Sequence, residues 1–105
     1  MDTNTKAYLD LAELLKALAH PLRLCIVRGL LQKGGCNVSH MQECLGAPQS
    51  TISQHLQKLR AAGIITGTRK GLEVQYQVSD PTVIELIHGF QIALYNKRDA
   101  YYDNK

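Results

Sequence analysis

The sequence predicts a small, mainly α-helical domain with one β-hairpin. Apolar residues recur at helical spacing from residue 3 to about residue 62, alternate with polar residues over residues 64–78, and return to helical spacing after Pro81. At 105 residues, with 45% hydrophobic and 20% charged side chains, residues 1–105 are expected to form a single domain with a modest core.

Three helices are expected in the N-terminal half. The first, capped by Thr3 or Thr5, has an apolar stripe that is broader than one small core can cover. This stripe consists of Tyr8, Leu11, Leu15 and Leu18. Pro21 fits the first turn of the second helix, where its missing N–H has no cost. The third helix is short, with Asn37 as its cap and Gly46 at its end.

A fourth helix is predicted from Pro48 to Gly63. One face is apolar, and the other carries short or flat hydrogen-bonding side chains: Gln49, Ser50, Ser53, Gln54, Gln57 and Lys58. Such amides and hydroxyls suit the edges of DNA bases, although an ordinary solvated face is the alternative. Only Ala47 and Pro48 separate this helix from the third one, so the two are expected to form a helix-turn-helix.

A hairpin with a basic tip is expected next. Residues 64–68 and 73–78 read as its strands, and Arg69, Lys70 and Gly71 as its turn. The two charges contribute nothing to packing but could contact phosphates beside a groove. Residues 49–80 carry four basic and two acidic side chains, and the net charge of +3 permits a polyanionic partner.

A fifth helix is expected after Ser79 or Asp80, either of which can cap it, with Pro81 at its first position. Its apolar residues Val83, Ile87, Phe90 and Leu94 again exceed what one small core needs. We therefore interpret the two terminal helices as a homodimer interface, which would set two DNA half-sites roughly 34 Å apart. Residues 96–105 are expected to be frayed.

Several classes of protein are disfavoured by what the sequence lacks. No apolar run approaches the roughly 20 residues of a membrane span, and no signal-peptide pattern precedes the first helix, so a cytoplasmic protein with no membrane partner is expected. There is no Ser-His-Asp spacing, phosphate loop or paired carboxylate motif, which argues against an enzyme. A protein-interaction module remains an alternative to a DNA-binding protein.

Several segments resemble the ArsR/SmtB repressors: residues 15–24, residues 49–56, residues 62–65, and Arg69-Lys70-Gly71 together with Tyr76. The resemblance covers residues 11–90 and implies a dimeric winged helix-turn-helix of five helices and a two-stranded wing. Such a repressor binds a palindromic double-stranded operator until an inducer lowers its DNA affinity. The expected DNA-binding residues are Gln49, Ser50, Thr51, Ser53, Gln54, His55, Lys58, Arg69 and Lys70, among which His55 more often has a packing role.

The sensor sites known in this family do not carry over to this sequence. Cys36, His40 and Cys44 remain, spaced by four, and could form a thiol sensor or hold a soft metal such as zinc if the third helix began early. The alternative is a repressor without an effector, in which Cys44 packs in the core and the other two are solvated. Cys25 is expected to be inert packing in the second helix, and three cysteines do not suggest a disulfide framework.

Overall fold

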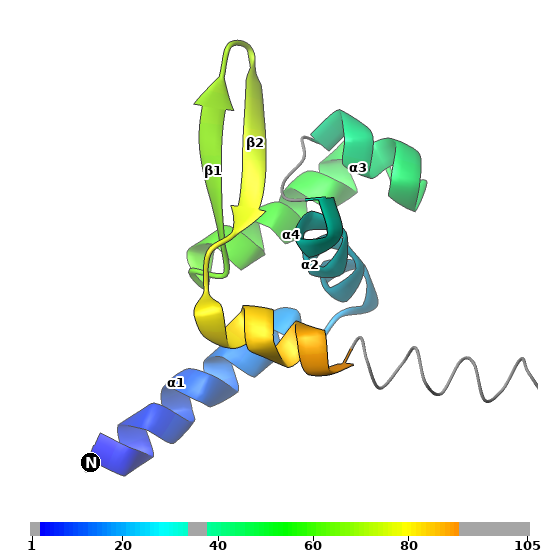
Figure 1. The fold of residues 1–105 in the computed structure, drawn as a ribbon. Coiled ribbons are helices and arrows are strands. Elements are labelled where there is room, and N and C mark those ends of the chain that lie inside the picture. Colours follow the sequence, from blue (N-terminus) through cyan, green and yellow to red (C-terminus); the bar gives the residue numbers. More distant parts are fainter. Residues whose placement is uncertain (1–2, 34–37, 91–105) are drawn as a thin grey trace, which may run out of the picture.

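The computed structural model describes residues 3–33 and 38–90, except for the side chains of Thr3, Lys33, His40, Glu43 and Cys44. The elements follow one another as α1 (Thr3–Leu18), α2 (Pro21–Lys33), α3 (Val38–Leu45), α4 (Gln49–Ala61), β1 (Ile65–Lys70) and β2 (Glu73–Val78) (Figure 1). Residues 81–90 are also helical up to the limit of the described residues. The described part of the chain thus contains four helices with both ends given, rather than the five expected, and the segment 81–90 corresponds to the beginning of the expected fifth helix. The expected fraying of residues 96–105 lies outside it.

The start of α2 depends on a histidine that the sequence patterns did not single out. Pro21 is the first residue of α2, as expected. The residue before it, His20, accepts a hydrogen bond on Nδ1 from the backbone N–H of Leu22 (3.1 Å), which satisfies one of the free donors of the first turn. In α1, by contrast, Thr5 lies inside the helix, so its expected capping role is wrong.

The end of α4 is set by Gly63, whose φ of 75° is the left-handed conformation that glycine adopts without strain. The N–H of Gly63 bonds to the carbonyl of Arg60 (3.0 Å), and the N–H of Ile64 bonds to that of Leu59 (3.0 Å). These two bonds are the Schellman pattern that satisfies the last carbonyls of a helix. Ile64 and Leu59 are both fully buried, so this turn also anchors the start of the hairpin in the core.

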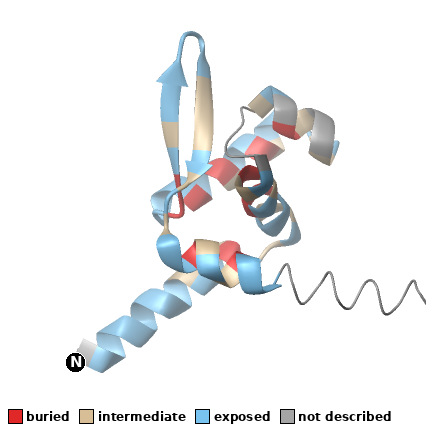
Figure 2. Ribbon diagram, in the orientation of Figure 1, coloured by how far each residue is buried: buried red, intermediate tan, exposed pale blue. Residues whose placement is uncertain are grey.

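The core lies where α2, α4, the base of the hairpin and the residues 81–90 helix meet (Figure 2). Its buried residues are Leu18, Ile26, Val27, Leu30, Met41, Ile52, Leu56, Leu59, Ile64, Ile65, Val83 and Ile87. Asp80 begins the residues 81–90 helix, because its Oδ1 accepts hydrogen bonds from the N–H groups of Thr82 (2.8 Å) and Val83 (3.2 Å). Asp80 is therefore the cap of this helix, one of the two residues expected.

Most of α1 projects away from this core (Figure 1). Only Leu18 at its end is fully buried, whereas Tyr8 is 72%, Leu11 41% and Leu15 42% exposed. The expectation that the apolar stripe of this helix exceeds the core of one chain is confirmed. No helix in the described residues is long and apolar enough to cross a lipid bilayer.

The hairpin turn differs from the expected one. β1 and β2 are antiparallel, and β1 continues through Lys70, which lies opposite Glu73. The turn is therefore Gly71-Leu72, not Arg69-Lys70-Gly71. Gly71 has a φ of 65° and no non-glycine residue in the described ranges has a positive φ, which fits a two-residue type II′ turn.

Candidate nucleic-acid interface

The orientation of α4 follows from its apolar spacing. Ile52, Leu56 and Leu59 are buried, so the opposite side of the helix faces solvent. Pro48 precedes the helix in an extended conformation (φ −62°, ψ 151°) and makes no side-chain capping bond, as its chemistry requires. The free N–H groups of the first turn are thus not covered by a capping side chain, and the first turn contains no acidic residue.

The polar residues of α4 form three strips along the helix, as their spacing of 100° per residue dictates. Ser50 and Gln54 point away from the core, Gln49 and Ser53 flank the core on one side, and Lys58 flanks it on the other; all five are exposed. Thr51 and His55 lie in the same strip as Lys58 and are half-buried. The expected DNA-binding residues of α4 therefore do not all share one surface.

Gln49 and Ser53 border a groove of about 300 Å³ between α4, α3 and the wing, the β1–β2 hairpin. Val38 and Ser39 line it from α3, Leu72 from the turn of the wing, and Glu73, Val74 and Tyr76 from β2. The beginning of α4 and the wing thus border the same groove. This arrangement places amide, hydroxyl and wing side chains within reach of one ligand.

Arg69 and Lys70 point to opposite faces of the wing, because consecutive side chains in a strand alternate. Arg69 is paired with Val74, so it lies on the same face of the wing as Val74 and Tyr76, two residues that line the groove beside α4. Lys70 is on the other face, directly opposite Glu73, which also lines the groove and carries a negative charge next to Lys70. Arg69 is therefore better placed than Lys70 to contact a phosphate beside α4. The expected turn put both residues in the loop and so did not distinguish them.

His55 packs against the junction of α1 and α2. Its ring lies 4.4 Å from that of His20, centroid to centroid, and its Nδ1 is buried without a hydrogen-bond partner in the described residues. Burial lowers the pKa of His55, and the nearby charges of His20, Arg23 and Lys58 lower it further. Of the two roles considered for this residue, its surroundings favour packing.

We expect this histidine to make folding stability depend on pH. Its pKa is below 6.5 in the folded state, so the unfolded chain binds more protons as the solution is acidified. Its contribution to stability is full above pH 6.5 and is lost as pH falls through the lowered folded pKa. Urea unfolding at a series of pH values should show this loss in wild type and a weaker one in His55→Gln.

The matched control is His88→Gln, which removes an exposed histidine from the residues 81–90 helix. This variant should keep the wild-type pH profile. Identical profiles for wild type and His55→Gln would contradict the assignment.

The side chains of the candidate sensor residues Cys36, His40 and Cys44 are not among those that the structure describes. Cys36 lies outside the described ranges, and His40 and Cys44 lie in α3 but their side chains are not described. In the described part of the chain, no three His, Cys, Asp or Glu side chains gather closely enough to hold a metal ion. Cys25 is exposed, so the expectation of inert packing is wrong. Helical spacing directs Ile26, Val27 and Leu30 inward and turns Cys25 away from them.

A helix-turn-helix whose second helix presents an exposed polar face, followed by a two-stranded wing, defines the winged helix-turn-helix class of DNA-binding proteins. A family profile described as a helix-turn-helix domain matches residues 18–68. The transcriptional repressor PagR of Bacillus anthracis is 45% identical over 78 residues, which are 74% of this chain and 78% of PagR. The chain belongs to the ArsR/SmtB family of winged-helix transcriptional repressors.

Solved structures agree with this assignment. The crystal structure of PagR has a TM-score of 0.76 and 41% identity, covering 82% of this chain and 98% of that one. A homodimeric winged helix-turn-helix DNA-binding domain from Mycobacterium bovis has a TM-score of 0.79 and 27% identity, covering 95% and 93%.

A second relative named as a repressor is SmtB of Mycobacterium tuberculosis, which is 44% identical over 75 residues, 71% of this chain and 55% of SmtB. PagR and SmtB are both named as transcriptional repressors, not enzymes. This chain is accordingly a DNA-binding transcriptional repressor.

Proposed function

We propose that the protein is a homodimeric repressor in which each α4 reads one half-site of a palindromic operator. The observation that carries this proposal is the set of exposed amide and hydroxyl side chains at the beginning of α4, of which Gln49 and Ser53 border one groove together with the wing. A major groove about 12 Å wide admits one α-helix, and its base edges present the donors and acceptors that such side chains match.

The residues of this face have distinct roles in the proposal. In this proposal Gln49 and Gln54 make bidentate hydrogen bonds to adenine, and Ser50 and Ser53 bond to several base edges. The first-turn N–H groups of α4, uncovered by any capping side chain, bind a backbone phosphate. Arg69 contacts a phosphate from the wing, which positions the helix but reads no sequence.

Dimerisation is proposed through α1 and the C-terminal helical segment. Tyr8, Leu11 and Leu15 on α1 and Phe90 at the end of the described residues expose between 41% and 72% of their surface in the isolated chain. Exposed apolar surface at this scale on two neighbouring elements is typical of an interface. The homodimeric relative from Mycobacterium bovis supports a two-fold arrangement of this kind.

The test is selection of palindromic duplexes from a random pool by the protein, followed by affinity measurements on the selected and a scrambled duplex. Wild type should prefer the selected duplex by at least about 10³-fold at physiological salt. Gln54→Ala should lose about 1–3 kcal/mol of that preference, because the variant leaves a base edge unpaired. Arg69→Ala should weaken both duplexes alike and reduce the slope of log affinity against log salt by about 1.

The controls are Gln77→Ala, at an exposed position of β2, and Lys70→Ala on the opposite face of the wing from Arg69. The first should leave both affinities unchanged, and the second should have a smaller effect than Arg69→Ala. Equal binding of selected and scrambled duplexes by wild type would contradict the proposed function.

A further inference from the structure

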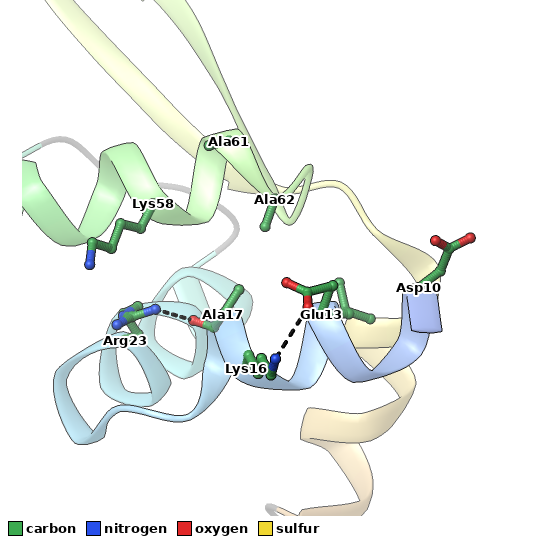
Figure 3. A pocket seen from close by; sticks show the side chains of 9 residues that line it. Asp10, Glu13, Lys16, Ala17, Arg23, Lys58, Ala61 and Ala62 are labelled. Atoms are coloured by element: carbon green, nitrogen blue, oxygen red, sulfur yellow. Dashed lines mark hydrogen bonds and ion pairs between the residues drawn. The ribbon is translucent and has the colours of Figure 1, made fainter. Parts of the chain in front are cut away.

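A pocket of about 630 Å³ opens between α1, α2 and the C-terminal half of α4 (Figure 3). It lies on the Lys58 side of α4, away from the groove beside the wing. On α1 it is lined by Glu13 and Ala17, which helical spacing places on a different side from Leu11 and Leu15. The pocket and the proposed dimer face thus use different sides of α1.

Two cations from different helices meet at one end of this pocket. Arg23 of α2 is held in place, because its Nη1 donates a hydrogen bond to the carbonyl of Ala17 (2.8 Å). Its Nε is buried and has no acceptor among the described residues. Figure 3 shows Lys58 extending from α4 toward the guanidinium of Arg23. A guanidinium has five N–H donors, so one bond to the backbone fixes its orientation and leaves others for a ligand.

No carboxylate of the described residues is ion-paired with Arg23 or Lys58. Glu13 instead pairs with Lys16 (3.3 Å). Asp10, the other acidic residue that lines the pocket, lies at the end of the pocket away from Arg23 and Lys58 (Figure 3). The positive field of the two cations reaches His55, since both contribute to lowering its pKa. Among the described residues, this end of the pocket is therefore positively charged and has no ion-paired carboxylate.

We propose that Arg23 and Lys58 form an anion-binding site that takes a phosphate or carboxylate group. Oxygens of such a group accept charge-assisted hydrogen bonds from both side chains, and arginine is suited to their planar geometry. Two sources can supply the group: a small molecule, or the backbone of bound DNA.

A small anion at this site has a consequence for DNA binding. Lys58 is one helical turn beyond Gln54 on α4, so the anion neutralises a cation next to the DNA-reading residues and weakens DNA binding. This consequence rests on the proposed function, whereas the anion site itself does not.

The first arm of the test titrates the DNA-free protein with inorganic phosphate at constant ionic strength and follows backbone amide resonances by NMR. Saturable shifts are expected around Arg23 and Lys58. Lys58→Gln should raise the apparent Kd for phosphate about tenfold, because one charge-assisted hydrogen bond is lost. Arg60→Gln removes the same charge from an exposed position on another side of α4 and should change the Kd less than about twofold.

Arg23→Gln, with exposed Arg28→Gln on α2 as its control, gives an independent second pair of variants. The second arm measures the affinity of all four variants for a selected duplex over a range of salt. If phosphate shifts no resonance but Arg23→Gln and Lys58→Gln lower DNA affinity and salt slope more than their controls, the DNA backbone is the source of the anion.

Phosphate shifts that persist in Arg23→Gln and Lys58→Gln would overturn the anion site. So would the absence of both a phosphate effect and a specific DNA effect. Loss of sequence preference in wild type would remove the proposed function while leaving the phosphate result intact.

Discussion

Replacing Ile52 with alanine is expected to lower the free energy of unfolding by about 3–4 kcal/mol, because a fully buried side chain leaves a cavity in addition to the lost apolar burial. Ile52 is completely inaccessible and belongs to the core cluster. A domain of this size has only about 5–15 kcal/mol of total stability, so the loss is a large fraction of it. Urea unfolding followed by far-UV circular dichroism at one fixed protein concentration measures the change.

Ile52→Ala should lower DNA affinity in conditions where it lowers the folded fraction, because the packing of the buried side of α4 holds the polar side of this helix in place. Leu72→Ala is the matched control, since Leu72 is 96% exposed at the turn of the wing and should change stability by less than about 0.5 kcal/mol. A loss below about 1 kcal/mol for Ile52→Ala would mean that α4 is not anchored as the structure indicates.

The fold could largely be predicted from the sequence because each element has a local signal. The apolar spacing that buries Ile52, Leu56 and Leu59 also fixes which side of α4 faces solvent. The helix boundaries at Pro21 and Gly63 follow from backbone chemistry that belongs to single residues. Such signals do not depend on what lies far away in the chain.

The site could be predicted only in part, because it depends on contacts between distant segments. The two faces of the wing follow from strand register, and the register changes when the turn is Gly71-Leu72 instead of Arg69-Lys70-Gly71. Helical spacing alone cannot show that Lys58 shares a pocket with Arg23, 35 residues earlier, or that His55 packs on His20. Those pairings arise when α1, α2 and α4 pack together.

Introducing a charge into the exposed stripe of α1 is expected to separate the proposed dimer and to lower operator affinity by about 100-fold. Leu15→Glu is the suitable change, because Leu15 is 42% exposed in the single chain and its replacement should leave the monomer folded. At a two-fold interface the same substitution enters from both subunits, so two carboxylates are introduced into one apolar contact. Sedimentation velocity should show a monomer at concentrations where wild type is a dimer.

Operator affinity falls in Leu15→Glu because a monomer can bind only one half-site, whereas a dimer binds both half-sites of one operator at once. In a dimer the second α4 binds at a high effective concentration, which can raise the overall affinity by about 10²–10⁴ over one half-site. Leu15→Glu should therefore lose affinity for the full palindrome while its affinity for an isolated half-site stays unchanged. Lys6→Gln, which alters net charge equally at an exposed position on another side of α1, should stay dimeric with wild-type affinity. A dimeric Leu15→Glu protein with full operator affinity would place the interface elsewhere.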